Sequence, residues 1–319
     1  MWTEVFHFMS TDGQTISCTL WRPEARRPRV VLQVLHGMTE YIGRYAELAQ
    51  ALTERGIALV GYDLRGHGHN KPFERCASFG KEGWTAALED IQCCQRMLRQ
   101  SFQGIPQAIM GFSLGSFLVR DYLNHYDTPF AGAIIMGTGT QPGMVLATLK
   151  LMVQGQIDKV GFNNTSPLVQ KLSFEMYNKK FAPNATAFDW LCADSNELAI
   201  YEQDALCKES ISAGLFWQLL DAMQRTSGKQ AYAHWDKNLP VLLLSGAEDL
   251  VGDSGKGVQK VAQQMKAAGL SCVQMELLEG ARHDVLHEKA SGNAEKALGL
   301  IEEFLAECVG RENRGGESC

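Results

Sequence analysis

Short segments that are apolar almost throughout alternate with longer helix-forming segments along most of the chain. The apolar segments, typical of strands buried on both faces, lie at residues 30–35, 57–62, 107–110, 131–136, 241–244 and 272–278. Helix-forming stretches follow them at residues 44–55, 84–102, 114–125, 255–268 and 294–309. A hairpin, residues 4–10 and 15–21, precedes the first of these strands. The alternation predicts an α/β fold whose mostly parallel sheet is flanked by helices.

The alternation stops after residue 140 and resumes after residue 235. Residues 141–235 contain helical patterns at 144–153, 196–205 and 212–225 but no convincing strand. A segment of this length is too long for an ordinary loop. We therefore predict a core in two parts, residues 1–140 and 236–319, interrupted by a helical cap insertion at 141–235. The tail from about residue 310 is polar, and we expect it to be loose.

Composition excludes several classes of protein. Apolar residues make up 45% of the chain and charged residues 21%, values typical of a globular protein. The net charge of −6 disfavours a nucleic-acid partner. No apolar run approaches the ~20 residues that cross a bilayer, and the first residues do not resemble a signal peptide. The nine cysteines include no C-x-x-C pair, so we expect free thiols, no zinc site and a cytoplasmic location.

The pattern G-x-S-x-G occurs once at a place where it can carry chemistry. Gly111-Phe112-Ser113-Leu114-Gly115 ends an apolar strand and opens an apolar helix. A nucleophile elbow needs this position, because the glycines permit a tight turn and the serine then projects from the sheet edge. The pattern alone is weak, but its context makes Ser113 the candidate nucleophile.

A serine nucleophile needs a base, and the base needs an orienting acid. In this kind of fold both follow the serine, each at the end of a later strand. Asp249 follows the strand at 241–244, and His283 follows the strand at 272–278. The rival acids are Glu248 and Asp253, with Asp253 expected to cap the next helix. The rival base, His287, lies further from the strand end and is expected in the next turn or helix.

An oxyanion hole needs two backbone N–H groups. The residue after the nucleophile, Leu114, supplies one of them. The loop after the strand at 30–35 reads His36-Gly37-Met38 and points to the N–H of Met38 for the other. We expect the His36 side chain to support this loop rather than to act as a catalyst.

Several longer motifs resemble one known family. His36 to Tyr45 reads H-G-x-x-E-x-x-x-R-Y, and Asp63 to His69 reads D-L-R-G-H-G-H. Together with the segments at 111–115, 245–249 and 280–287, they resemble the monoacylglycerol lipase and lysophospholipase branch of the α/β-hydrolases, a serine aminopeptidase-like group. The resemblance spans the core. It implies an α/β-hydrolase fold with a cap over the site, catalysis by Ser113, Asp249 and His283, and oxyanion donors at Met38 and Leu114.

The resemblance is weaker in the insertion. Animal monoacylglycerol lipases carry a cysteine shortly after the acid, where this chain has Gly252. Asp189-Trp190-Leu191 and Tyr201-Glu202-Gln203-Asp204 look more like bacterial lysophospholipase-type relatives. The identity of the substrate therefore does not carry over from the animal enzymes.

Two sets of side chains in the insertion bear on the substrate. Leu146, Leu149 and Met152, with Met144 and Val153, form an apolar stripe that suits either an acyl-chain wall or core packing. Residues 215–223 are a second candidate for the acyl path. Four acidic residues could bind a substrate amine but more commonly form a solvated helix face: Asp194, Glu197, Glu202 and Asp204.

We therefore predict a serine hydrolase that cleaves carboxylic esters of small-molecule or lipid type, such as monoacylglycerols or lysophospholipids. It needs no cofactor or metal, and His67-Gly68-His69 is expected to be a structural turn. The alternatives are a peptidase or amidase of the proline iminopeptidase type, and a hydrolase fold retained only for ligand binding.

Overall fold

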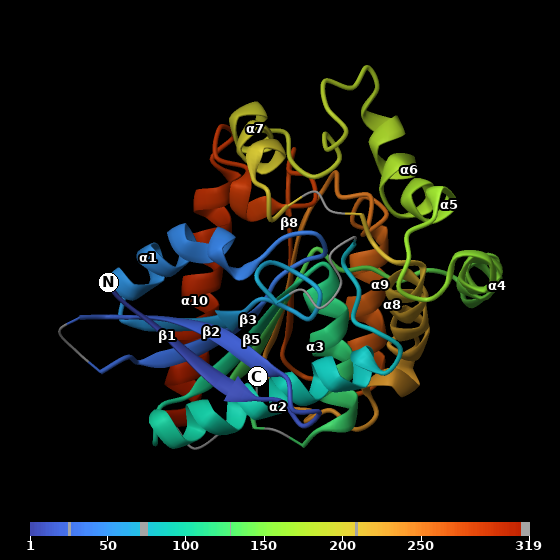
Figure 1. The fold of residues 1–319 in the computed structure, drawn as a ribbon. Helices are drawn as coiled ribbons and strands as arrows, with labels where there is room; N and C mark the ends of the chain where they lie inside the picture. Colours follow the sequence, from blue (N-terminus) through green and yellow to red (C-terminus); the bar gives the residue numbers. More distant parts are fainter. Residues whose placement is uncertain (25–26, 71–75, 128, 208–209, 314–319) are drawn as a thin grey trace.

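The chain forms an eight-stranded sheet with the order β1-β2-β4-β3-β5-β6-β7-β8 (Figure 1). The structure is a computed structural model that describes residues 1–24, 27–70, 76–127, 129–207 and 210–313. β1 and β2 pair antiparallel with each other, β2 pairs antiparallel with β4, and the remaining pairs are parallel. The strands are β1 (Trp2–Met9), β2 (Thr15–Arg22), β3 (Val30–Leu35), β4 (Ile57–Tyr62), β5 (Gln107–Phe112), β6 (Gly132–Met136), β7 (Val241–Gly246) and β8 (Val273–Leu278).

Helices cover both faces of the sheet, which explains why its central strands are apolar throughout. α1 (Ala46–Glu54) and α10 (Asn293–Asn313) pack on one face. α2 (Gly83–Ser101), α3 (Leu114–His125) and α9 (Lys256–Ala267) pack on the other. Successive strand side chains point to opposite faces, so Val31 lies in one core and Leu32 in the other. The predicted α/β-hydrolase fold class is confirmed.

Two features differ from the sequence-based expectation: the burial of β8 and the end of α10. β8 lies at the edge of the sheet, and its residues alternate between exposed and half-buried positions. α10 continues to Asn313, so the prediction of a loose tail from about residue 310 is wrong for residues 310–313. The rest of that tail lies outside the described residues.

The chain between β6 and β7, which we call the insert (residues 141–235), is built from helices and turns. α4 (Gly143–Val160) extends well beyond the expected 144–153. α8 (Ala213–Arg225) packs against α3 and α4, so it joins the insert to the core. The other elements are α5 (Pro167–Gln170), a π-helical turn (Lys171–Glu175), α6 (Met176–Asn178), a 3-10 turn (Lys179–Phe181), α7 (Ser195–Gln203) and a second 3-10 turn (Lys229–Tyr232).

One buried arginine joins both ends of the insert to α3. The Arg120 side chain is fully buried, and its Nη1 donates to Thr138 Oγ1 (3.0 Å) and to the Gly139 carbonyl (2.9 Å). Its Nη2 donates to the Thr226 carbonyl (2.7 Å) and to the Tyr232 hydroxyl (2.8 Å). A buried charge needs such partners to offset its loss of hydration. Arg120 therefore contacts both the segment just before the insert and the segment near the end of the insert.

Two further expectations concern cysteines and membrane spans. Seven cysteines are free thiols: Cys18, Cys76, Cys93, Cys94, Cys192, Cys207 and Cys308. Cys272 is disulfide-bonded, so the expectation of free thiols is wrong at this position, and Cys319 lies outside the described residues. Among the described helices, none combines the length and apolar character needed to cross a bilayer.

Candidate active site

Ser113 lies at the sharp turn between β5 and α3. Its backbone has φ 50° and ψ −114°, an unusual conformation for a residue with a side chain. A Cβ at Gly111 would lie 2.2 Å from the Gly115 carbonyl oxygen, and one at Gly115 would lie 2.2 Å from the Leu35 carbonyl oxygen. Both glycines are therefore required by close backbone packing, as the elbow interpretation expects.

His283 lines the same cavity as Ser113, and Asp249 is hydrogen-bonded to His283. His283 Nδ1 donates to Asp249 Oδ1 over 2.9 Å, and both residues are buried. The carboxylate also accepts from Ser245 Oγ and from the Val251 N–H, each over 2.9 Å. With Nδ1–H held by the acid, His283 Nε2 carries the lone pair. Nε2 is buried and has no hydrogen-bond partner among the described residues, and both Ser113 and His283 line the cavity.

The rival residues lie elsewhere. Glu248 and Asp253 are exposed. Asp253 precedes α9 in a turn, and Gly255 is the residue at the N-cap, so the expected capping role of Asp253 is wrong. His287 lies in a 3-10 turn, and its Nδ1 is 2.8 Å from Asp284 Oδ2 rather than near Asp249.

The loop that contains Met38 is held by buried side chains. The Leu64 N–H donates to His36 Nε2 (2.8 Å), so Nδ1 carries the ring proton and donates to the Gly37 carbonyl (2.7 Å). Burial lowers the pKa of His36, which keeps the ring neutral. His36 thus links the loops after β3 and β4. Leu114 is the first residue of α3, where an N–H has no acceptor within the helix.

Glu40 and Arg44 connect this loop to the residue after His283. Glu40 accepts hydrogen bonds from the Gly37 N–H and the Tyr45 hydroxyl, and Arg44 Nε donates to it over 2.9 Å. Arg44 Nη2 also donates to Asp284 Oδ2 over 2.8 Å. The H-G-x-x-E-x-x-x-R-Y motif therefore builds a buried brace between the loops that carry Met38 and His283.

Asp284 and His287 form a pair within this brace. Burial raises the pKa of the Asp284 carboxyl, but the charges of His287 and Arg44 outweigh burial and hold it well below its usual range. Burial lowers the pKa of His287, but the Asp284 carboxylate outweighs burial and raises it above its ordinary value. The pair therefore favours the charged form of both partners.

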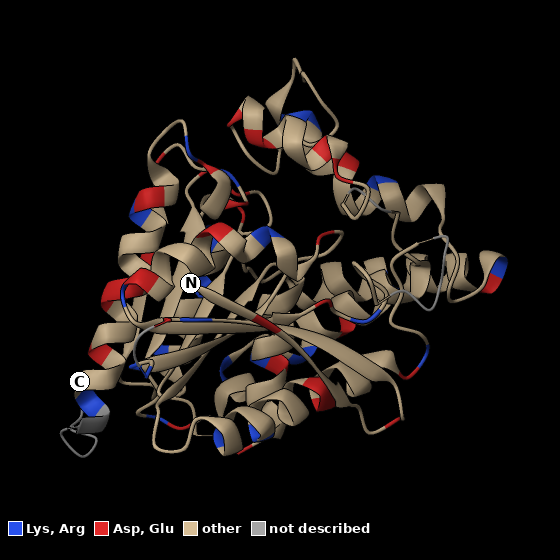
Figure 2. Ribbon diagram, turned by 60° about the vertical axis from the view of Figure 1, so that its left-hand side comes forward, with Lys and Arg blue, Asp and Glu red and all other residues tan. Residues whose placement is uncertain are grey.

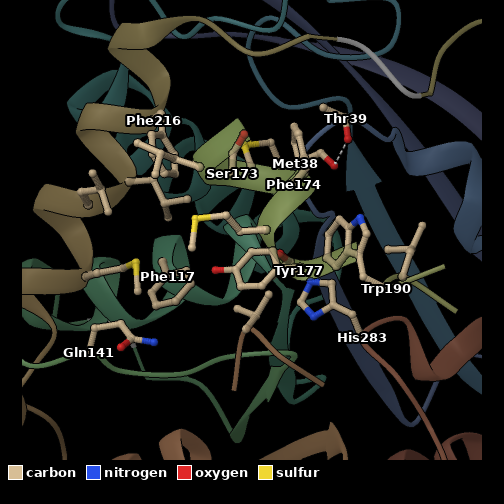
Figure 3. A pocket seen from close by; sticks show the side chains of 18 of the residues that line it. Met38, Thr39, Phe117, Gln141, Ser173, Phe174, Tyr177, Trp190, Phe216 and His283 are labelled. Carbon is tan, nitrogen blue, oxygen red and sulfur yellow. Dashed lines mark hydrogen bonds between the residues drawn. The ribbon is translucent and has the colours of Figure 1, made fainter. Parts of the chain in front are cut away.

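A cavity of about 290 Å³ opens beside Ser113 and His283 (Figure 3). Leu146 and Leu149 line it, whereas Met152 does not and is 42% exposed. The assignment of Met152 to the wall is therefore wrong, because this side of α4 turns away from the cavity. Residues of the second candidate path also line it: Phe216, Leu219, Leu220 and Met223 of α8. Burial raises the pKa of Tyr177, another lining residue, to about 12, so its phenol stays uncharged.

None of the four acidic residues considered for amine binding lines this cavity. Asp194 caps α7 by accepting from the Asn196 and Glu197 N–H groups. Glu197 pairs with Lys289 over 2.8 Å, and Asp204 accepts from the Tyr41 hydroxyl over 2.8 Å. Glu202 also lies outside the lining, and the lining carboxylate, Glu40, is already engaged by three donors.

The structure offers no metal cluster in its described part. No group of three His, Cys, Asp or Glu side chains there could hold an ion. His67 Nδ1 donates to the Arg65 carbonyl (2.8 Å) and His69 Nδ1 lies 3.1 Å from Asp63 Oδ2, so these two histidines form part of a turn.

A family model matches most of the chain. It is described as Hydrolase_4, serine aminopeptidase, S33, and it matches residues 26–290. The chain belongs to this family. The match includes strands β3 to β8, the insert, and Ser113, Asp249 and His283.

Relatives of this Hydrolase_4 chain include lipases and esterases. Human monoglyceride lipase is 25% identical over 284 residues, which cover 89% of this chain and 84% of the human protein. A thermostable carboxyl esterase from Bacillus coagulans superposes with a TM-score of 0.85 at 19% identity, covering 97% and 99% of the two chains. The monoacylglycerol lipase of Paleococcus ferrophilus gives a TM-score of 0.69 at 20% identity, covering 92% and 99%. At these identities the two structures bear on the fold alone.

Sequence reasoning missed how the insert of this Hydrolase_4 chain reaches the loops that contain Met38 and His283. The Tyr201 hydroxyl donates to the Thr39 carbonyl over 3.0 Å, next to Met38. The Asp284 N–H donates to the Leu191 carbonyl over 2.7 Å, next to His283. Leu191 and Tyr201 belong to the two short motifs of the insert, at residues 189–191 and 201–204, that were noted for the family resemblance. These motifs could have indicated that the two residues contact the core. Their contacts join residues more than 90 positions apart and have no local pattern.

Proposed function

We propose that this chain is a serine hydrolase that cleaves carboxylic esters with an apolar acyl chain, with monoacylglycerols or lysophospholipids as the preferred class. The observation that carries the proposal is the cavity, in which Ser113 and His283 share one space with apolar side chains of α4 and α8. The monoglyceride lipase relatives support carboxylic-ester hydrolysis.

The proposed reaction has two steps. Ser113 Oγ attacks the ester carbonyl while its proton passes to His283 Nε2. The N–H groups of Met38 and Leu114 hold the negative oxygen of the tetrahedral intermediate. The intermediate collapses to an acyl-enzyme as His283 returns its proton to the departing alcohol. Water then gives a proton to His283 as its oxygen attacks the acyl group. The second tetrahedral intermediate collapses as His283 returns that proton to Ser113 Oγ, which releases the acid and restores the enzyme.

Asp249 has an orienting role in this scheme. Its bond to Nδ1–H keeps the lone pair on Nε2, where the serine proton must go. Ser245 and Val251 fix the carboxylate in turn. An acid with this role contributes on the order of 10⁴ in kcat.

Amide hydrolysis is the second candidate, favoured by the description of the family. A free substrate amine would need an available carboxylate in the cavity. The four acidic residues considered for this task lie outside the lining, and Glu40 is bonded to Gly37, Arg44 and Tyr45. This arrangement favours esters over aminoacyl amides.

A fluorophosphonate probe tests the proposal. We expect mass spectrometry to place the adduct on Ser113 and not on neighbouring Ser116, and we expect Ser113→Ala to abolish labelling. The same variant should lower kcat by about 10⁶. An adduct on Ser116, or none, would refute the assignment and favour a fold retained for binding.

A substrate panel tests the ester class separately. p-Nitrophenyl esters of increasing chain length and aminoacyl p-nitroanilides are compared with the wild-type protein. We expect kcat/KM to rise with chain length until the cavity is filled, and the anilides to remain uncleaved. Cleavage of the anilides faster than the esters would favour the amide alternative.

Partners and location complete the proposal. In the view of Figure 2, Lys and Arg are interspersed with Asp and Glu, which supports a small-molecule substrate rather than nucleic acid. The proposal includes a cytoplasmic location. The seven free thiols support this location, whereas the disulfide at Cys272 counts against it.

A further inference from the structure

The ring of His283 contacts two aromatic rings, one from the core and one from the insert. The centroid of Phe112 is 4.9 Å from that of His283, with an interplanar angle of 40°. The centroid of Trp190 is 5.2 Å from it, with an angle of 34°. Figure 3 shows Trp190 beside His283. Phe112 belongs to the G-x-S-x-G turn, but Trp190 comes from a segment more than 90 residues before His283 in the sequence.

Trp190 is held firmly in this position. Its side chain is 7% exposed, and its ring contacts Phe174 and Tyr177 with centroid separations of 5.9 and 5.6 Å. Its backbone N–H donates to Asn178 Oδ1 over 3.0 Å. The indole is therefore part of a packed aromatic group rather than a free side chain at the cavity wall.

Both neighbours of His283 bind the backbone on either side of Trp190. Arg282 Nη1 donates to the carbonyls of Asp189 and Cys192. The Asp284 N–H donates to the Leu191 carbonyl over 2.7 Å. These bonds fix residues 189–192 against residues 282–284, so the indole and the imidazole keep their relative position.

We propose that Trp190 is a positioning residue for His283, supplied by the insert to the catalytic base. The inference rests on the proposed function, since it assigns a role through His283. Asp249 fixes one edge of the imidazole, whereas Phe112 and Trp190 limit its rotation out of plane. When His283 takes the serine proton, its positive charge also lies against the π-face of an indole, which attracts cations more strongly than other aromatic rings.

Kinetics of two variants test this role. We expect Trp190→Leu to lower kcat on p-nitrophenyl acetate about tenfold and to leave KM within twofold, because the loss concerns the charged form of the base. The pH at which kcat/KM is half-maximal should fall by about half a unit to one unit. Trp190→Phe keeps a ring and should recover at least a third of the activity.

Trp217→Leu is the matched control. It makes the same substitution at another tryptophan of the insert, but Trp217 lies on α8, contacts Lys150 Nζ and does not line the cavity beside Ser113. We expect this variant to keep the wild-type kcat and pH profile on the acetate ester. Equal losses in Trp190→Leu and Trp217→Leu, or a Trp190→Leu profile with an unmoved midpoint, would overturn the proposal.

Tryptophan fluorescence gives a readout that does not depend on activity. Imidazolium quenches an indole that it contacts more strongly than neutral imidazole does, so emission should rise as His283 loses its proton. We expect this pH-dependent part to disappear in both Trp190→Phe and His283→Gln. Its persistence in Trp190→Phe would overturn the contact. If the wild type shows the titration but is not labelled by the fluorophosphonate, the proposed function fails while the contact stands.

Discussion

Two parts of the insert are attached to the core in different ways. The first, which we call the wall segment (residues 143–181), lines the cavity through apolar side chains such as Leu146 and Leu149 and leaves Met144 and Leu151 84% and 75% exposed. Its bonds to the core include one from Ser78 Oγ to Asn163 Oδ1 over 3.0 Å, remote from the catalytic residues.

The second part, the anchor segment (residues 189–204), is bonded to the loop that contains Met38 and to the chain that follows His283. The Ala193 N–H donates to Glu288 Oε1 over 3.0 Å, and Tyr201 donates to the loop that contains Met38. The contrast leads to different expectations for the two segments. We expect changes in the wall segment to alter which acyl chain is preferred, and changes in the anchor segment to alter the rate with every substrate.

The largest expected effect comes from removing the Glu288 carboxylate, which links the anchor segment to the chain around His283. This carboxylate is 1% exposed, and its Oε1 accepts from the N–H groups of Arg282 and Ala193. Glu288→Ala leaves both donors buried and unpaired, so we expect the free energy of unfolding to fall by about 3 kcal/mol. Chemical denaturation measures this loss, and kcat should fall for acetate and long-chain esters in equal proportion.

Glu288→Gln is the control for that experiment. Its amide oxygen can still accept from both N–H groups, so most of the stability and activity should remain. If Glu288→Ala instead affects long-chain esters alone, the anchor segment has the same role as the wall segment and the contrast fails.

The next effect should come from narrowing the cavity at Leu149. We expect Leu149→Trp to fill the space of about three methylenes, which would remove about 2.4 kcal/mol, roughly 60-fold, from kcat/KM for long-chain esters. Activity on acetate esters should change less than twofold. Met152→Trp, on the same helix but outside the lining, should leave the chain-length preference unchanged. Equal loss on short and long esters would mean that Leu149 is core packing.

A smaller effect is expected at the link between α7 and the Met38 loop. Tyr201→Phe removes the hydroxyl that donates to the Thr39 carbonyl, so kcat should fall about fivefold with every ester. Steady-state kinetics on the ester panel measures this loss. Tyr177→Phe also removes a phenol from the cavity lining but leaves the Thr39 bond intact, and it should have little effect on acetate. A loss confined to long chains in Tyr201→Phe would contradict an anchoring role.

The smallest effect concerns pH and the Asp284–His287 pair. The folded-state pKa of His287 is raised by Asp284, so its stabilising contribution is complete below the unfolded value of about 6.5 and is lost as pH rises through the folded value. We expect the difference in free energy of unfolding between wild type and His287→Gln to shrink as pH rises from 5 to 9. Denaturation at several pH values measures it, and a difference that grows with pH would contradict the pairing.

The core could be predicted from the sequence because its signals are local. Strands β3 to β7 are buried on both faces and read as apolar runs, and Ser113 and Asp249 follow two of them, whereas His283 follows the edge strand β8. Parallel strands bring such residues to one edge of a sheet, so chain order was sufficient to select them.

The insert was harder to predict for a physical reason. α4 has apolar side chains on several faces, because one side contacts α8, another lines the cavity and a third is exposed. No single stripe therefore distinguishes Leu149 from Met152. The contact of the Trp190 ring with His283 depends on interactions between distant segments, and the spacing of residues along the chain does not encode it.

The four hydrogen bonds of Arg120 have a consequence for protein engineering. The carbonyls of Gly139 and Thr226 accept hydrogen bonds from the same guanidinium, so these two residues lie close together. They mark two points at which the insert could be removed and replaced. A foreign helical cassette spliced between them would meet a core that presents a fixed pair of attachment points. Such a graft into this chain would need its own partners for the loops that contain Met38 and His283.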